Sequence, residues 1–317
     1  MFNILVITDG KLSSLNQCSS IVNELKNKPK RNISSKYIIY NPGVLRILPN
    51  LFIYYFLLIK NFFRKYQIGK TDLIISCGRV SAPLNLVLKK QIKCKNYHIL
   101  NPYFKINKFD KVIIPEHDIK KIKKNYSPNL ITTFGTLVDK KNFQESKTIP
   151  SKYFKKNRNK IISVLVGGSG RSSSINFDDL ICVIKKLNAL NDNFQIIYCF
   201  SRRTTTKLKN FIINNANKNS IFFPTKIFNP YWYLFEISNF IFVTGDSISM
   251  ISDSLSSGKP TYIIPVKKVK KKINFFVMSS IKRGLARVFQ NKLETWKYKT
   301  LSEARRVCKS IKSDLNL

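Results

Sequence analysis

Small hydroxyl side chains and two aspartates follow a short apolar run in the second half of the chain. The run Phe240–Val243 leads into Thr244-Gly245-Asp246-Ser247 and on to Asp253. Such residues can expose backbone N–H groups at the start of a helix, where the helix dipole favours a phosphate or another anion. Asp253 lies about two helical turns beyond Asp246, so its carboxylate could accept hydrogen bonds from sugar hydroxyls in the same site. Asp and Ser are also ordinary helix caps, and capping alone is the alternative interpretation.

Two further apolar runs end in loops suited to anions. Ile161–Val166 continues into Gly167-Gly168-Ser169-Gly170-Arg171, a turn that can bring backbone amides close to a phosphate. Phe194–Phe200 ends in Ser201-Arg202-Arg203-Thr204, where a guanidinium could pair with a diphosphate or where two arginines simply flank a helix cap. Three such loops indicate a nucleotide-type ligand, although the chain has neither a Walker A sequence nor a GxGxxG fingerprint. The candidate binding residues are Gly167, Gly168, Ser169, Ser201, Arg202, Arg203, Thr244, Asp246, Ser247, Ser249 and Asp253.

The first half offers polar residues at three expected strand ends: Thr8-Asp9-Gly10-Lys11, Ser76-Cys77-Gly78-Arg79 and Pro115-Glu116-His117-Asp118. His117 could be a general base for a hydroxyl nucleophile, or it could cap the following helix. His98 is expected to be a strand residue and not a catalyst. Consecutive residues rarely converge on one ion, so we expect no metal site.

Composition indicates a folded protein with one large or two medium domains. The chain has 317 residues, of which 44% are hydrophobic, and its six cysteines are scattered without a CxxC pair. We expect these cysteines to be reduced and mostly buried, as in the cytoplasm. The first ten residues lack the features of a signal peptide and are typical of a core strand.

The formal net charge of +39 would favour nucleic acid, an anionic membrane or phosphorylated substrates. Lysine beside abundant Asn and Ile is also what a nucleotide bias of the genome would produce. The denser basic runs are Lys120–Lys124, Lys155–Lys160 and Lys267–Lys272. Together they could hold the protein on an anionic bilayer, whereas no recognisable module indicates specific nucleic-acid binding.

The most apolar tract is Leu51–Ile59, which Pro49 precedes and Lys60 follows. It is too short to span a membrane, because a spanning helix needs about 20 apolar residues. Two interpretations remain, a buried core helix and a helix lying in a membrane interface.

Short β-rich runs alternate with longer helical stretches, which predicts an α/β fold with parallel sheets covered by helices. The expected strands are Phe2–Thr8, Lys36–Tyr40, Leu73–Ser76, Tyr97–Leu100, Lys111–Ile114, Leu130–Thr133, Ile161–Val166, Phe194–Phe200, Ile221–Phe223, Phe240–Thr244 and Tyr262–Pro265. The expected helices are Ser14–Asn27, Leu51–Lys65, Ser81–Lys90, Asp118–Lys124, Phe177–Leu190, Thr204–Asn215 and Ser247–Ser257. A basic, polar segment from Lys140 to Lys160 separates the two series. This repetition predicts two Rossmann-like domains, residues 1–150 and 151–317, with ligands beyond the carboxyl ends of the strands.

The order of these motifs resembles the bacterial relatives of the plant mitochondrial fission factor named for elongated mitochondria, a family related to GT-B glycosyltransferases. The resemblance covers nearly the whole chain and rests on Thr8-Asp9-Gly10, Asn16-Gln17, Ser76, Gly78-Arg79, Ala82-Pro83, Phe109-Asp110, Pro115-Glu116-His117-Asp118, Thr133, Gly135, Gly167-Gly168, Ser201-Arg202-Arg203-Thr204, Asn229-Pro230-Tyr231, Thr244, Asp246-Ser247, Ser249-Met250, Ser252 and Gly258-Lys259-Pro260. It implies a GT-B-like arrangement of two domains facing across a cleft. The second half looks like the donor domain of the lipid-linked N-acetylglucosaminyltransferase of cell-wall synthesis, in which Gly167-Gly168-Ser169 would match the diphosphate turn. Asp253 would hold the donor ribose, although the family usually has Glu there and often has His where Val138 stands.

These observations lead to the expectation of a metal-independent glycosyltransferase with a nucleotide-diphosphate sugar as co-substrate and no other cofactor. Arg202 and Arg203 would neutralise the leaving diphosphate, and His117 or Asp9 would deprotonate the acceptor. The acceptor would be anionic or lipid-linked, at the cytoplasmic face of a membrane to which the protein binds peripherally. The alternative is a non-catalytic adaptor of the same family that binds membrane or a protein partner.

Overall fold

The computed structural model describes residues 1–27, 32–119, 128–144, 148–150, 160–190, 194–225 and 228–316. The chain forms two compact units. Unit 1 comprises Met1–Asp139 and Ser302–Leu317, and unit 2 comprises Lys140–Leu301. Unit 2 is therefore inserted into unit 1, and the C-terminal segment that we placed in the second domain belongs to the first.

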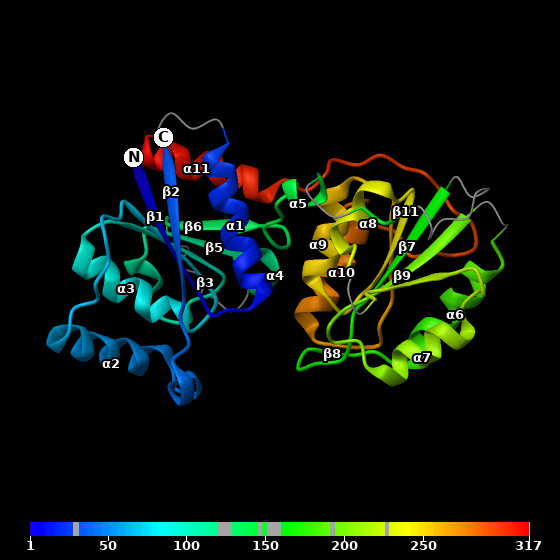
Figure 1. The fold of residues 1–317 in the computed structure, drawn as a ribbon, viewed down its shortest axis with the longest axis horizontal. Helices are drawn as coiled ribbons and strands as arrows, with labels where there is room; N and C mark the ends of the chain where they lie inside the picture. The colour runs from blue at the N-terminus through cyan, green and yellow to red at the C-terminus, as the bar shows by residue number, and fades with distance from the viewer. Residues whose placement is uncertain are drawn as a thin grey trace. The chain divides into compact units, whose positions relative to one another are not determined.

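Unit 1 is built on a six-stranded sheet in the order β2-β1-β3-β4-β5-β6 (Figure 1). All its neighbouring strands are parallel, and Ile4 of the first strand lies opposite Ser35 on one side and opposite Leu73 on the other. The strands are β1 (Phe2–Thr8), β2 (Ile33–Ile39), β3 (Leu73–Cys77), β4 (Lys95–Ile99), β5 (Lys111–Pro115) and β6 (Leu130–Thr133).

Helices cover both faces of this sheet. They are α1 (Leu12–Lys26), η1 (Gly43–Ile47), α2 (Asn50–Phe63), α3 (Ser81–Ile92), η2 (Ile106–Lys108), α4 (Glu116–Ile119) and α11 (Glu303–Leu315). One buried cluster joins α1 and α11 to β1 and β3, and it includes Ile21, Val307 and Ile311. The other joins α2 and α3 to the opposite face, with Ile53 and Val87 among its members.

Unit 2 has a five-stranded parallel sheet in the order β10-β9-β7-β11-β12. Its strands are β7 (Lys160–Val166), β9 (Phe194–Phe200), β10 (Ile221–Phe223), β11 (Phe240–Thr244) and β12 (Thr261–Ile264). The short strands β8 (Ser173–Ser174) and β13 (Lys268–Val269) pair separately as an antiparallel ladder. The helices are α5 (Lys141–Gln144), α6 (Phe177–Asn188), α7 (Thr206–Asn215), α8 (Tyr231–Ile237), α9 (Ile248–Ser257) and α10 (Lys271–Lys282).

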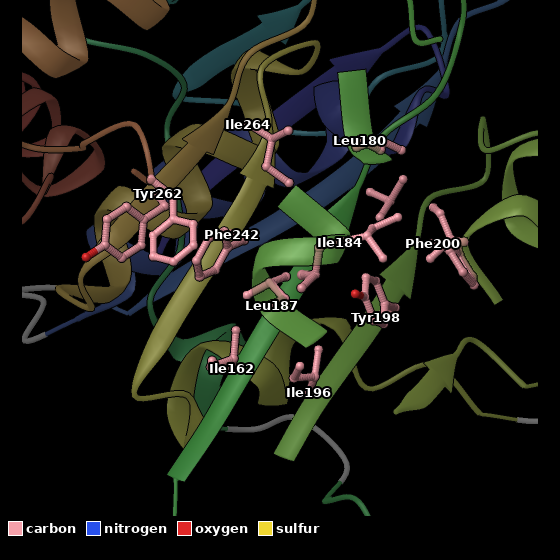
Figure 2. Close-up of a cluster of buried hydrophobic side chains, with 14 of the residues drawn as sticks. Ile162, Leu180, Ile184, Leu187, Ile196, Tyr198, Phe200, Phe242, Tyr262 and Ile264 are labelled. Carbon is pink, nitrogen blue, oxygen red and sulfur yellow. The ribbon is translucent and has the colours of Figure 1, made fainter. Parts of the chain in front are cut away.

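The core of unit 2 forms where α6 and α7 lie on the sheet (Figure 2). Leu180, Ile184 and Leu187 lie at helical spacing on one side of α6 and pack against Ile162 and Ile196 of the strands. Burial of such a side chain contributes about 1.5–3 kcal/mol, so this helical stripe fixes α6 on the sheet.

The α/β class and the parallel sheets are confirmed, and each expected strand has a counterpart with ends that differ by a few residues at most. Lys120–Lys124, which form the end of the expected helix Asp118–Lys124 and the first basic run, lie outside the described residues. Most of the second basic run, Lys155–Lys160, also lies outside them. The cysteines are all free; Cys18, Cys77, Cys199 and Cys308 are buried, whereas Cys182 is exposed.

Candidate nucleotide site

The strand order of unit 2 brings the three candidate loops to one edge of its sheet. Strands β9, β7 and β11 are consecutive neighbours, and their carboxyl ends lead into Ser201, Gly167 and Gly245, respectively. The chain builds β7, β9 and β10 outward in one direction and then crosses to β11 and β12 on the other side of β7. The gap between β7 and β11 is therefore a topological switch point, where parallel α/β sheets bind ligands.

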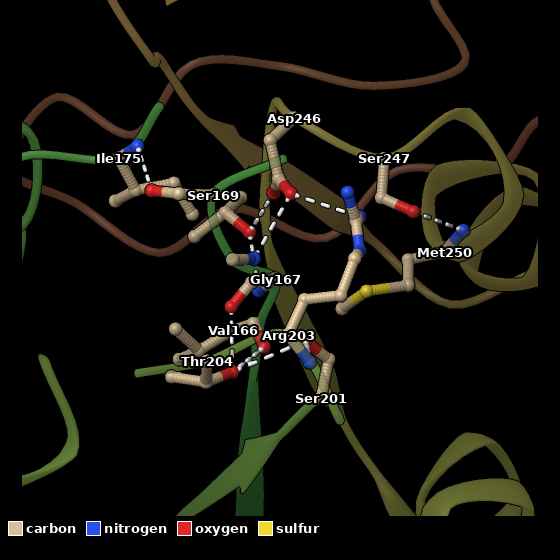
Figure 3. Close-up of polar contacts among 12 residues, drawn as sticks. Val166, Gly167, Ser169, Ile175, Ser201, Arg203, Thr204, Asp246, Ser247 and Met250 are labelled. Atoms are coloured by element: carbon tan, nitrogen blue, oxygen red, sulfur yellow. Dashed lines mark hydrogen bonds and ion pairs between the residues drawn. The ribbon is translucent and has the colours of Figure 1, made fainter. Parts of the chain in front are cut away.

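Asp246 links all three loops (Figure 3). Its Oδ2 accepts hydrogen bonds from the Gly168 amide at 3.1 Å and from the Arg203 guanidinium at 3.2 Å, and its Oδ1 accepts one from the Thr244 hydroxyl at 2.5 Å. The Thr244 hydroxyl in turn accepts a hydrogen bond from the Gly167 amide at 2.8 Å. Burial raises the pKa of the Asp246 carboxyl, although the Thr244, Gly168 and Arg203 contacts act in the opposite direction.

Gly167 and Gly168 are required by close packing. A Cβ on Gly167 would lie 2.1 Å from Oδ1 of Asp246, and a Cβ on Gly168 would lie 2.0 Å from the carbonyl oxygen of Arg203. Non-bonded atoms cannot approach so closely, so a larger residue at Gly167 would displace the Asp246 carboxylate, and one at Gly168 would displace the backbone of the loop after β9.

The loop after β9 is tied to the same corner. The Thr204 hydroxyl donates to the carbonyl of Gly167 at 2.6 Å and lies 3.1 Å from the Ser201 hydroxyl. The Arg203 amide donates to the Ser201 hydroxyl at 3.2 Å. Arg202 is exposed, and no contact of its guanidinium is found among the residues that the structure describes.

Helix α9 begins at the switch point. The Ser247 hydroxyl caps it by accepting a hydrogen bond from the Met250 amide at 3.5 Å. Within the described part of the chain, the amides of Ile248 and Ser249 have no acceptor. Figure 3 places the Arg203 guanidinium between Asp246 and Ser247, the residue that caps the positive end of the α9 dipole.

Asp253 is buried within α9 and contacts α8. Its Oδ2 accepts a hydrogen bond of 2.6 Å from the Tyr231 hydroxyl. Burial raises the pKa of Asp253 to about 7, and the Tyr231 hydrogen bond acts against this rise. The Tyr231 hydroxyl is also held protonated, because burial and the neighbouring carboxylate raise its pKa. The carboxyl group that we expected to bind a ribose therefore already has an internal partner.

These contacts assign different parts to the sequence-based candidates. Gly167, Gly168, Thr244 and Asp246 satisfy one another, and the glycine amides are not available to a diphosphate. The Ser169 hydroxyl accepts a hydrogen bond from the Ile175 amide at 3.3 Å. Arg202, Ser249 and the free amides of α9 remain as groups that can meet an anion. Sequence reasoning assigned no role to Tyr231, although Asn229-Pro230-Tyr231 belongs to the family pattern.

In unit 1, Asp9 follows β1 beside the switch point between β1 and β3. The carboxylate accepts a hydrogen bond from the Lys11 amide at 3.3 Å and forms an ion pair with the Lys11 ammonium group. Burial raises the pKa of Asp9, but the hydrogen bonds from Lys11 and Ser14 and the charge of Lys11 outweigh it, and the net pKa lies below the ordinary value. Asp9 is thus ionised at neutral pH and is a weak base.

His117 lies in α4, after β5, with a side chain that is 5% exposed and with Nε2 3.9 Å from Oδ2 of Asp118. Strands β3 and β4 separate β1 from β5, which places the two strand ends roughly 14 Å apart. Asp9 and His117 therefore cannot act on the same proton. His98 lies fully buried in β4, as expected, and its Nδ1 is 2.7 Å from the Ser76 hydroxyl.

Within the described residues, no group of three or more His, Cys, Asp or Glu side chains is arranged to hold a metal ion. In the same part of the chain no helix combines the length and the hydrophobicity that crossing a membrane requires.

Sequence comparison identifies one family and two curated relatives. A model of the family described as Mitochondrial fission ELM1 matches residues 14–315. An uncharacterised protein of Rickettsia prowazekii, RP120, is 30% identical, and the alignment covers 99% of each chain. The mitochondrial fission protein ELM1 of Arabidopsis thaliana is 23% identical over 77% of this chain, and the chain spans only 64% of that protein.

Solved structures share the fold at low sequence identity. A structure of S. aureus MnaA with UDP matches with a TM-score of 0.58 and 12% identity, covering 99% of this chain and 89% of that one. The glycotransferase of kitacinnamycin also matches with a TM-score of 0.58 and 12% identity, covering 99% and 91%. The chain thus has the GT-B fold of glycosyltransferases, as the sequence resemblance implied.

Proposed function

The chain belongs to the mitochondrial fission ELM1 family, and on this premise we propose that unit 2 binds a nucleotide-diphosphate sugar and that the protein transfers the sugar to an acceptor hydroxyl. The observation that carries the proposal is the convergence of three loops at the switch point of β7 and β11 through the single carboxylate of Asp246. The hydrogen bonds of this carboxylate fix the positions of the three loops before a ligand binds, which reduces the entropic cost of binding.

The diphosphate would be bound by those polar groups of the three loops that make no hydrogen bond within the described protein or that keep exposed N–H groups. They are the amides of Ile248 and Ser249, the exposed guanidinium of Arg202, and the outer N–H groups of Arg203, whose side chain is 45% exposed. Arg203 would remain paired with Asp246 and would add positive charge without a change of position. The bound form of MnaA contains UDP, which makes a uridine nucleotide the first ligand to test.

Asp253 would take part in ribose binding together with Tyr231. A carboxyl group with a pKa of about 7 is partly protonated at neutral pH, so it can either accept from or donate to a ribose hydroxyl. The Tyr231 hydroxyl would keep its hydrogen bond to one oxygen and leave the other for the sugar.

In the transfer step, the acceptor oxygen forms a bond to the anomeric carbon while the bond from that carbon to the diphosphate oxygen breaks. The electron pair leaves with the diphosphate, where Arg202, Arg203 and the α9 dipole stabilise the charge.

The acceptor proton passes to a base, for which His117 and Asp9 are the candidates. His117 is the better candidate, because the ion pair with Lys11 and the lowered pKa make Asp9 a weak base. His117→Ala should then abolish turnover and retain nucleotide binding.

The test is calorimetric titration of the full chain with UDP, ADP, GDP and CDP and with their common sugar conjugates. Arg202→Ala is the variant, because Arg202 has no described contact whose loss would disturb the fold, and Lys185→Ala removes one exposed charge of α6 as the matched control. We expect saturable binding of one base, weakened about tenfold in Arg202→Ala and unchanged in Lys185→Ala. Absence of binding by every nucleotide to folded protein would refute the proposal.

An adaptor without catalytic activity is the second candidate. The name of the Arabidopsis relative and the exposed apolar face of α2 favour it. An adaptor would bind its target at full strength in the absence of nucleotide, whereas a transferase requires one.

A further inference from the structure

Helix α2 has an inverted pattern of exposure, because its solvent-facing side is apolar. The helix packs on α3 and buries Asn50, Ile53, Tyr54 and Leu57. The exposed apolar side chains are Leu51, Phe52, Tyr55, Phe56, Ile59, Phe62 and Phe63, which we call the α2 apolar face. They spread over roughly 140° of the helix circumference, and Lys60 lies at the border. Phe52 is 63% exposed, Phe62 82% and Phe63 81%. A surface helix normally shows the opposite pattern, and continuous apolar patches mark interaction sites.

The helix is held rigidly to unit 1, so its exposure is a property of the fold. The side-chain amide of Asn50 donates hydrogen bonds to the carbonyl oxygens of Arg79 at 2.6 Å and of Pro102 at 2.7 Å. The Arg79 guanidinium donates to the carbonyl of Leu48 at 3.0 Å and to that of Arg46. These bonds fix the turn from η1 into α2. Val44 and Ile47 of η1 are 83% and 80% exposed and add apolar surface before the helix begins.

The charges around the α2 apolar face have one sign. Arg46, Lys60, Arg64 and Lys65 are exposed within or beside the two helices, and between Glu24 and Asp110 the only acidic residue is Asp72. The Lys105 ammonium group lies 4.3 Å from the centre of the Tyr54 ring and 4.9 Å from that of Tyr55, so a cation also lies above the aromatic part of the helix. The surface thus combines a hydrophobic centre with a basic rim.

We infer that the α2 apolar face inserts into the interface of an anionic lipid bilayer, with α2 parallel to the membrane plane. The α2 apolar face presents one side-chain polar group, the Tyr55 hydroxyl, which suits an apolar and fluid environment better than a protein surface with fixed hydrogen-bonding groups. The basic rim is complementary to anionic headgroups, and each basic residue near such a surface strengthens binding roughly fivefold. With 14 residues, α2 is about 21 Å long, which is enough to lie in the interface but too short to cross it. This inference concerns unit 1 alone and does not depend on nucleotide binding.

The test is flotation of the full chain with vesicles of phosphatidylcholine alone and with vesicles of phosphatidylcholine and phosphatidylglycerol in equal parts, at low and at high salt. Salt matters because a chain with a net charge of +39 will adsorb to anionic vesicles without insertion. Insertion of phenylalanine and isoleucine side chains is not screened by salt. We therefore expect binding to the anionic vesicles that decreases but persists at high salt.

The variant is Phe62→Ser/Phe63→Ser, whose two side chains are more than four-fifths exposed and so contribute little to the buried core. The matched control is Leu12→Ser/Ile213→Ser, which removes two other exposed apolar side chains, at 51% and 43%. We expect the first variant to lose binding at high salt by at least about tenfold and the control to retain it. Binding that high salt abolishes in every protein, or that both variants lose equally, would overturn the inference. Sedimentation velocity without vesicles tests the alternative that the face binds a second copy of the chain. If the protein self-associates, loses this self-association only in Phe62→Ser/Phe63→Ser and does not float with vesicles, the face belongs to a second copy and the inference is wrong.

Discussion

The Tyr231 hydroxyl donates a hydrogen bond of 2.6 Å to the buried carboxyl group of Asp253, and this bond joins α8 to α9. Burial raises the pKa of Asp253 from its ordinary value of 3.8 to about 7, so the folded protein keeps a proton that the unfolded chain releases. The stabilising effect of this proton is fully present below pH 3.8 and is lost as the pH rises through about 7. The difference corresponds to roughly 4 kcal/mol.

Asp253→Asn should therefore make the stability of unit 2 less dependent on pH between about 4 and 7. Urea unfolding across this pH range measures the effect, with Asp178→Asn, a substitution of an exposed aspartate, as the control. In Tyr231→Phe, the loss of stability with rising pH should occur at a higher pH, because the hydrogen bond that this substitution removes lowers the pKa of Asp253. An unchanged pH profile in Asp253→Asn would show that this carboxyl group is ionised in the folded state at acidic pH.

Gly168→Ala should destabilise unit 2 strongly. The added Cβ would lie 2.0 Å from the backbone oxygen of Arg203, and a backbone cannot move aside as a flexible side chain can. We expect a loss of at least about 3 kcal/mol in the free energy of unfolding, measured by denaturant titration. Gly69→Ala is the control, because its Cβ would meet no atom within 4 Å and its φ is not positive. Equal stability of the two variants would contradict the close approach of the two loops.

Arg203 and Arg202 are adjacent but should respond differently to substitution. Arg203→Ala removes the cation paired with the fully buried Asp246 side chain and should cost about 1.5–3 kcal/mol of stability. Arg202→Ala should leave thermal stability unchanged, because the described structure gives its side chain no partner. Thermal unfolding of both variants, without nucleotide, tests the difference. Similar melting temperatures for the two would argue against the Arg203–Asp246 ion pair.

The fold was largely accessible from the sequence, because strands and helices are local patterns. Runs such as Ile161–Val166 and Phe240–Thr244 are apolar, short and followed by polar turns, and both are strands in the structure. Helix α11 was not predicted. Its buried side chains Val307, Cys308 and Ile311 complete the core of unit 1, although the whole of unit 2 lies between this helix and the rest of unit 1 in the sequence.

The candidate site was accessible only as a set of loops. Sequence order places Gly167 after β7, but the acceptor of its amide, Thr244, lies 77 residues further on. Asp253 likewise has its partner 22 residues before it, and the sequence gives no measure of burial from which its raised pKa could be inferred. For Leu51–Ile59, an apolar run on every side of a helix does not specify which side packs on the protein, and the structure buries one side and exposes the other.

The return of α11 to unit 1 sets an order for folding during synthesis. A ribosome makes every strand of the first sheet early, yet the helix that completes one face of this sheet emerges only after the whole of unit 2. Unit 2 is continuous in sequence and can fold while unit 1 still lacks Val307 and Ile311 from its core. A chain that stopped after Leu301 would therefore be defective in the unit that was made first.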